Sequence, residues 1–446
     1  MDKIMVQSCL GSVRYFVPFS VYVLWLLAFP MDGVLSACAG SRNFLLWFLA
    51  PHAFALLVTG HYFTGERIFS RVSTVGIAVI IAVTALFPYC PEHYLTLAVL
   101  AGIFSAPLAI KACSLIKLSV KPFRTAAAGL AVGNVLLYIF ISLPLTGVVK
   151  ALVLALLLLI PLVSPGMVSV GGSIRPLVKY LPFVFVFQLV GGLMYGFLME
   201  EYAVHSFLNG SELLFYVVAV LSGIFVASRR LDALLALGVM AAMFSFSFLL
   251  GETGFSTNLS MYAMQAAAGF VDLFLICLLL SCEGTFKALG YGLATTCCAI
   301  VCGKIVSMVA GEQLSLIVSS GNIILTLSVL LLYFNSKKSQ SFPSPCLETG
   351  GPDWHSDSYV AVSANDSPMR SKVLPRGFSK HFSEKEKMVL ELVLVGKTFR
   401  EAASCLEISE SSVKTYMKRI YDKTGVSSKT ELVHLIDDMN GSLYTQ

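Results

Sequence analysis

The sequence predicts an all-α protein: a polytopic bundle of about twelve transmembrane helices, followed by a compact four-helix domain at the C-terminal end. The mean hydropathy is +0.80, and only 13% of the residues are charged, against about 25% in soluble proteins. The charges are also unevenly placed, with 18 basic and 12 acidic residues in positions 1–338 and 13 and 14 in positions 339–446. We therefore predict a membrane domain over 1–335, a linker over 336–379 and a soluble domain over 380–446.

Apolar segments long enough to cross a bilayer recur through the membrane domain. A transmembrane helix needs about 20 mostly apolar residues. The first candidate lacks the small-residue cleavage pattern of a signal peptide, so we expect it to remain as a span. The twelve candidates lie near residues 14–31, 43–63, 72–90, 94–114, 125–147, 149–170, 180–199, 211–228, 231–251, 258–281, 285–310 and 313–334.

Basic residues predict the orientation of these spans, because Lys and Arg are enriched in cytoplasmic loops. On one side the loops hold only Arg42 and Lys150. The other side holds Lys3, Arg14, Arg67, Arg71, Lys111, Lys117, Lys121, Arg124, Arg175, Lys179, Arg229, Arg230, Lys287, Lys337 and Lys338. We therefore expect both termini in the cytoplasm.

Two ionisable residues fall inside spans, where the cost of desolvation makes them candidates for a ligand or proton site. Asp272 lies roughly 20 Å from the outer end of its span and Lys304 roughly 9 Å from the outer end of the next one, at 1.5 Å per residue. Direct pairing is therefore not expected, and Lys304 is level with Gln265 instead. For Asp272 two roles stay open: a ligand or proton cavity, and a hydrogen-bonded contact between helices.

No other motif in the chain indicates chemistry. Cys297, Cys298 and Cys302 place thiols one helical turn apart, but no His or carboxylate follows closely enough in sequence to complete a metal site. The sequence has no Gly-rich phosphate loop and no Ser-His-Asp grouping on the cytoplasmic side. We predict no metal, no cofactor and no enzymatic activity.

The linker is rich in Ser, Pro, Gly and Asp and has no apolar period, which predicts disorder. A flexible chain of about 40 residues has an end-to-end distance of roughly 35 Å. Such a flexible linker keeps the C-terminal domain near the membrane but does not transmit a rotation of the membrane domain to it. A signal from the membrane domain is therefore expected to act by oligomerisation or by masking of the C-terminal domain.

Capping signals delimit the helices of the C-terminal domain. Ser383 and Glu386 form a capping box ahead of the first helix, and Ser409 and Gly425 enclose the third. The predicted helices cover about 384–396, 398–406, 410–424 and 429–438.

The third helix has two different faces. Its apolar residues recur at three- and four-residue steps, and its other face is basic, with Lys414, Lys418, Arg419 and Lys423 against Asp422. Positive charge concentrated on one helix is typical of a DNA-facing surface, although a solvated helix face carries lysines as well.

Residues 382–432 resemble the LuxR-type helix-turn-helix family of bacterial regulators. The matching residues are Phe382, Ser383, Glu386, Gly396, Glu401, Ala403, Leu406, Ile408, Ser409, Ser412, Val413, Lys414, Lys423, Thr424, Gly425 and Val426. The resemblance implies that the residues facing DNA are Ser412, Lys414, Thr415, Tyr416, Lys418, Arg419 and Lys423. Tyr416 departs from the family, which usually has His there. The fourth helix would be the family's dimer helix, and a dimer implies an inverted-repeat site on double-stranded DNA.

The membrane domain resembles the major facilitator superfamily at the level of architecture. The turns at Glu66–Arg71 and Arg229–Asp232 occupy equivalent places in two halves of six spans. The loop pattern of that family, Gly-x-x-x-Asp-x-x-Gly-Arg, is present only in fragments between Gly60 and Arg71. The resemblance implies a transporter-like bundle.

These features predict a one-component transcription regulator in the bacterial cytoplasmic (inner) membrane, with an unknown small molecule as its signal and a homodimer on DNA. A transporter with a regulatory DNA-binding tail is the alternative. A tail that serves only as a protein-interaction module is a third hypothesis.

Overall fold

A computed structural model of the chain describes residues 2–31, 33, 35, 44–63, 65–165, 172–228, 230–251, 253–310, 314–338, 382–394, 398–406, 408–426 and 431–432. In these residues the regular structure is helical, as the sequence predicts. The chain divides into two compact units, Met1–Lys337 and Lys338–Gln446. The predicted linker begins at 336, but the last helix of the first unit extends to Lys338; the rest of the linker, 339–379, lies outside the described residues.

In the described part of the first unit the chain forms the α-helices α1 to α13, and two short 3-10 helices, η2 (Phe87–Tyr89) and η3 (Pro91–His93), precede α4. The α-helices are α1 Asp2–Ala28, α2 Phe44–Tyr62, α3 Glu66–Leu86, α4 Tyr94–Ile116, α5 Pro122–Ser142, α6 Gly147–Leu157, α7 Leu159–Val163, α8 Arg175–His205, α9 Glu212–Ala227, α10 Leu231–Leu249, α11 Gly254–Ser281, α12 Thr285–Ala310 and α13 Leu314–Lys338.

Each of the twelve predicted spans coincides with a helix or with one interrupted helix. Among the residues that the structure describes, eight helical segments are long and apolar enough to cross a membrane. The other four predicted spans contain shorter apolar segments, at Val13–Ala28, Gly147–Val163, Glu212–Ala227 and Ser319–Leu332. A polytopic membrane bundle is therefore confirmed, with eight of the helices reaching full membrane length.

The sixth predicted span is interrupted. It forms α6 and α7, which meet at Leu158. Pro161 lies in the middle of α7 and has no N–H to donate to the carbonyl one turn before it, so the helical ladder breaks at this point.

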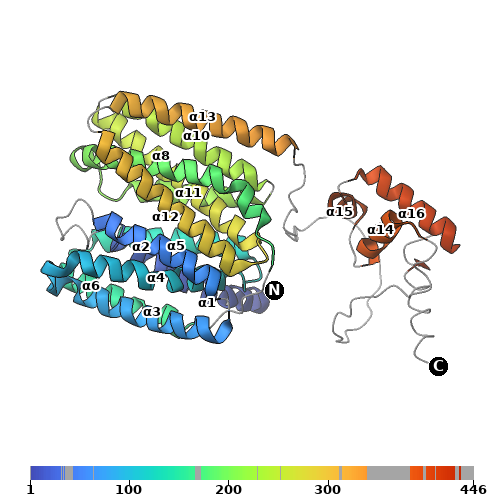
Figure 1. Ribbon diagram of the computed structural model, residues 1–446, viewed down its shortest axis with the longest axis horizontal. Helices are drawn as coiled ribbons and strands as arrows, with labels where there is room; N and C mark the ends of the chain where they lie inside the picture. The colour runs from blue at the N-terminus through green and yellow to red at the C-terminus, as the bar shows by residue number, and fades with distance from the viewer. Residues whose placement is uncertain are drawn as a thin grey trace. The chain divides into compact units, whose positions relative to one another are not determined.

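The first helix begins and the last helix ends at the same end of the bundle. Figure 1 shows the start of α1 and the C-terminal end of α13 at the same end of the bundle, with α1 to α6 in its lower part and α8 and α10 to α13 in its upper part. An even number of crossings produces this arrangement, and the location of both termini in the cytoplasm stays a prediction.

Glycines let α12 cross two of its neighbours closely. In the α8–α12 crossing, a Cβ placed on Gly192 would lie 2.7 Å from the carbonyl oxygen of Ile300, and one on Gly303 would overlap the carbonyl oxygen of Leu189. In the α2–α12 crossing, a Cβ on Gly60 would lie 2.7 Å from the Cα of Gly290. α12 therefore packs backbone to backbone on both neighbours.

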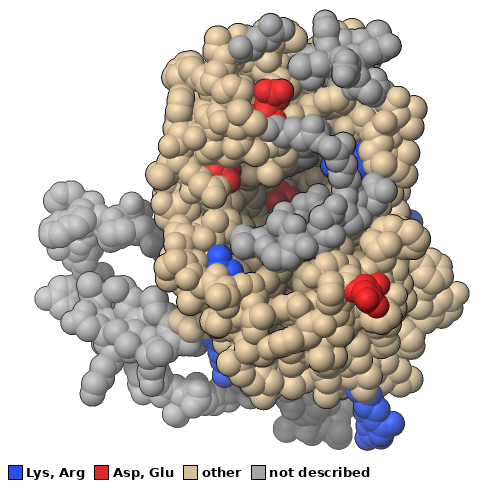
Figure 2. Space-filling view, turned by 90° about the vertical axis from the view of Figure 1, so that its left-hand side faces the viewer, with Lys and Arg blue, Asp and Glu red and all other residues tan. Residues whose placement is uncertain are grey.

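The end of the bundle opposite the start of α1 is hollowed at its centre. Figure 2 shows this face, where acidic side chains are scattered over a mainly uncharged surface and one of them lies recessed in the hollow.

Candidate nucleic-acid interface

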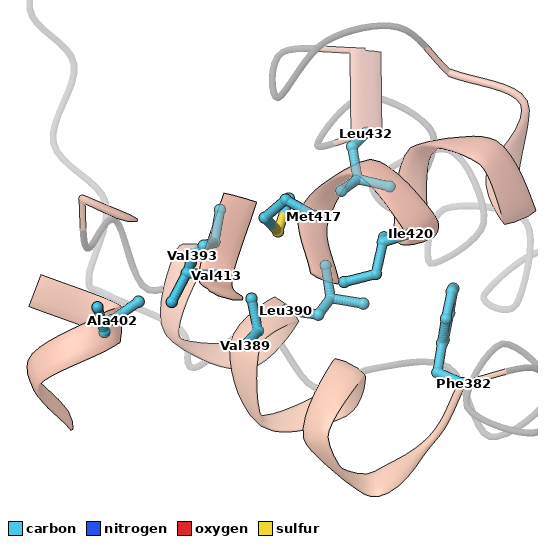
Figure 3. Packing of buried hydrophobic residues seen from close by; sticks show 10 residues of the cluster. Phe382, Val389, Leu390, Val393, Ala402, Val413, Met417, Ile420 and Leu432 are labelled. Carbon is cyan, nitrogen blue, oxygen red and sulfur yellow. The ribbon is translucent and has the colours of Figure 1, made fainter. Parts of the chain in front are cut away.

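The second unit has its own apolar core, formed by three helices, α14 (Glu384–Leu394), α15 (Phe399–Cys405) and α16 (Glu410–Thr424). Figure 3 shows the buried side chains of this core pointing toward one another between the helices. The ten members of the core are Phe382, Val389, Leu390, Val393, Ala402, Ala403, Val413, Met417, Ile420 and Leu432. Val413, Met417 and Ile420 fix which side of α16 faces inward.

Side-chain caps define where the helices start. Ser383 and Glu386 form the predicted capping box: the backbone N–H of Ser383 donates to Glu386 Oε2 at 2.8 Å, and the N–H of Glu386 donates to Ser383 Oγ at 3.3 Å. A second box, in which Thr398 pairs with Glu401 ahead of α15, was not predicted. Its signal was present, because a Thr followed three residues later by Glu is the capping-box pattern.

The predicted bounds of α16 are confirmed. Ser409 accepts a hydrogen bond from the N–H of Ser412 at 3.1 Å, and the helix ends at Gly425, whose φ of 72° is left-handed. Such a conformation favours glycine, which has no Cβ to clash. Of the predicted fourth helix, only Glu431 and Leu432 are described, and both are helical.

The outward face of α16 carries most of the predicted contact residues. Lys414, Thr415, Lys418 and Arg419 are exposed, and Ser412 is half-buried. At about 100° per residue, Thr415, Lys418 and Arg419 lie on the side away from the core, with Lys414 on one flank. Two further exposed residues on this side, Ser411 and Asp422, were not among the predicted contacts.

Two of the polar residues on this face have partners one turn away. Lys414 Nζ lies 2.8 Å from Glu410 Oε1, and the hydrogen bond to Lys414 holds the pKa of Glu410 below its usual range. The Arg419 guanidinium lies 6.0 Å from the ring of Tyr416, and Tyr416 packs on the edge of the core. Lys418 is therefore the most open of the three cations.

Lys423 has a structural partner that was not predicted. Its Nζ lies 2.8 Å from Oε2 of Glu386, whose side chain is 4% exposed. This oxygen also accepts the N–H of Ser383, and the hydrogen bonds from Lys423 and from Ser383 lower the pKa of Glu386. Lys423 thus ties the end of α16 to the start of α14, and its predicted contact with DNA stays a prediction.

In the membrane unit, Asp272 contacts polar side chains of two other helices. The hydroxyl of Tyr216, on α9, donates to Asp272 Oδ2 at 2.9 Å, and Gln188, on α8, also hydrogen-bonds to the carboxyl group. Asp272 therefore makes the contact between helices that was one of its two predicted roles. Its role as a ligand or proton site stays a prediction.

The other two intramembrane candidates are half-buried. Lys304 lies on α12 and Gln265 on α11. Among the described residues, no ion pair joins Lys304 to Asp272 or to another carboxylate. Within the same residues, no group of three or more His, Cys, Asp and Glu side chains has the arrangement of a metal site.

Comparison with known proteins identifies the second unit. Residues 380–436 match the GerE family, described as bacterial regulatory proteins of the luxR family. No curated protein sequence matches the chain. Among solved structures, the crystal structure of the human organic anion transporter MFSD10 (TETRAN) aligns with 73% of this chain and 98% of that one, at 16% identity and a TM-score of 0.49.

Proposed function

We propose that the chain is a membrane-bound one-component transcription regulator, which senses a signal through its helical bundle and binds promoter DNA through α16. The observation that carries the proposal is that α16, inside a domain that matches the LuxR family, has one apolar face and one basic face. Its inner face fills the core, while Lys414, Thr415, Lys418 and Arg419 project from the domain. Cations on a helix that enters the major groove contact phosphates and base edges.

We further propose that two copies of the domain bind an inverted repeat. Helix-turn-helix dimers place their recognition helices about 34 Å apart, which is one turn of DNA. The fourth helix, at about 429–438, supplies the dimer contact in this proposal. The basic loops favour a cytoplasmic location for the tail, in the inner membrane of a bacterium.

Alanine at Lys414 and Lys418 tests the DNA contact. We expect the affinity of the full-length protein for its promoter DNA to fall about tenfold for each lysine removed, because a hydrogen bond to a charged group contributes about 1.5–3 kcal/mol. The slope of log affinity against log salt should fall by about 1 per lysine. The measurement is fluorescence anisotropy in neutral detergent, with DNA fragments recovered by crosslinking to the intact protein.

Lys385→Ala is the matched control, since Lys385 is an exposed lysine on α14 of the same domain. It should bind DNA like the wild type. Equal binding by the double variant and the wild type would support the hypothesis that the tail is a protein-interaction module, whereas an equal loss per lysine in the control would mean that the lysines of α16 act only through the overall charge.

A substitution at Asp272 distinguishes a sensor from a transporter. Because its carboxyl group links α8, α9 and α11, we expect Asp272→Asn to change reporter expression from the target promoter at least severalfold while the affinity for DNA is unchanged. Tyr216→Phe removes one hydrogen bond and keeps the carboxylate, so it should have a smaller effect. Loss of uptake of a compound with unchanged reporter expression would favour the transporter.

A further inference from the structure

A cavity that is largely open to solvent lies at the end of the bundle where α2 ends and where α8 and α12 begin. Its volume is about 660 Å³, within the range of roughly 300–1,000 Å³ that is typical of sites for small ligands. Residues that the proposed DNA contact does not use line it, among them His61, Arg175, Lys179, Lys287 and Tyr291.

Three permanent cations converge on this cavity. Arg175 and Lys179 come from the first turns of α8, and Lys287 comes from the first turn of α12. In the part of the chain that the structure describes, none of the three lies within ion-pair distance of a carboxylate. Like charges brought together repel one another, so an anion in the cavity would relieve the repulsion.

Among the residues that the structure describes, the acid Glu283 borders the cavity without lining it. Glu283 Oε2 accepts a hydrogen bond from the backbone N–H of Ser173 at 3.3 Å. On its other side Glu283 acts electrostatically on Lys117, whose Nζ donates to the carbonyl oxygen of Cys282 at 2.7 Å. The backbone N–H of Ser173 and the positive charge of Lys117 therefore both offset the negative charge of Glu283.

The remaining wall suits an organic group. His61 Nδ1 and Tyr291 Oη lie 2.7 Å apart, with their rings at 82° to each other. The hydrogen bond fixes both aromatic side chains between α2 and α12. The apolar side chains of Ile174 and Val178 complete the wall.

We propose that this cavity binds a phosphate-bearing anion, with Arg175, Lys179 and Lys287 holding the phosphate and with His61 and Tyr291 against the rest of the molecule. Arg and Lys are the usual partners of phosphate groups in proteins, through charge-assisted hydrogen bonds. The phosphate comes either from a soluble phosphate ester or from the headgroup of an anionic phospholipid. This site goes beyond the proposed function and does not depend on DNA binding.

Titration of the full-length protein with inorganic pyrophosphate tests the soluble source. In neutral detergent, at an ionic strength held constant with sodium chloride, we expect a saturable rise in Tm, because a ligand stabilises the state that binds it. The double variant R175Q/K179Q should weaken binding about 100-fold, which is about tenfold per cation. Lys287→Gln, on a different helix, should weaken it about tenfold.

Lys121→Gln is the matched control: Lys121 is exposed, lies in a loop assigned to the same side of the membrane and is outside the cavity. It should bind pyrophosphate like the wild type. In nanodiscs, phosphatidylglycerol mixed into phosphatidylcholine should raise Tm in the wild type only, relative to R175Q/K179Q, if the source is a lipid. The proposal is overturned if neither probe stabilises the wild type saturably, or if the control loses as much as the cavity variants.

Discussion

Lys423→Ala is expected to lower the free energy of unfolding of the C-terminal domain by about 2 kcal/mol. The substitution removes the only cation that the structure places within 4.0 Å of the Glu386 carboxylate among the described residues. Glu386 is buried, and an unpaired buried charge is costly. Lys423 itself is 41% exposed, which places the expected loss below that for a fully buried pair.

Lys418→Ala is the control, because it makes the same substitution on the exposed face of the same helix. It should change the stability by no more than about 0.5 kcal/mol while weakening DNA binding. Hydrogen exchange of the α14 and α16 amides in the full-length protein measures both variants. If Lys423→Ala left the exchange unchanged and weakened DNA binding alone, Lys423 would be a DNA contact, as the resemblance to the family implies.

The same pair makes the stability of the domain depend on pH. The hydrogen bond from Lys423 is the largest cause of the lowered pKa of Glu386, so the folded state binds this proton more weakly than the unfolded state does. The stabilisation is complete above the unfolded pKa of about 4.3 and is lost as the pH falls through the lower, folded pKa. In the Glu386→Gln variant, hydrogen exchange corrected for the intrinsic rate should lack this contribution between pH 5 and pH 3.

Local signals explain why so much of the C-terminal domain could be predicted from the sequence. The bounds of α16 depend on Ser409 and Gly425, which act on the backbone within one turn. The partner of Lys423 could not be predicted in this way, because Glu386 lies 37 residues earlier. Residues that share a helix face are visible in a sequence, whereas ion pairs between helices depend on how the helices pack.

In the membrane domain, too, features that depend on nearby residues could be predicted from the sequence, whereas contacts between distant residues could not. Apolar length predicts the spans, and the interruption at Pro161 follows from one residue. The partners of Asp272 on α8 and α9, and the convergence of Arg175 and Lys287, require the arrangement of helices that are far apart in sequence. A count of apolar residues contains no information about that arrangement.

The crossing of α8 and α12 gives the largest effect that we expect in the membrane domain. A methyl group on Gly303 would overlap the carbonyl oxygen of Leu189 and lie 2.8 Å from the backbone nitrogen of Leu193. Backbone atoms of a helix cannot rotate away as a flexible side chain can, so the two helices must separate. We expect Gly303→Ala to cost about 3 kcal/mol, measured as a fall in Tm of the full-length protein in detergent.

Gly191→Ala, on the neighbouring helix α8, is the control, and we expect it to leave the stability unchanged or to raise it. A methyl group on Gly191 would meet only the Cε of Met264, at 3.7 Å, which is ordinary contact. Alanine is favoured over glycine inside a helix by about 1 kcal/mol, so this variant should be as stable as the wild type or slightly more stable. Equal losses in both variants would mean that the helices tolerate no added volume anywhere, whereas no loss in Gly303→Ala would mean that α8 and α12 do not approach as closely as Gly192 and Gly303 allow.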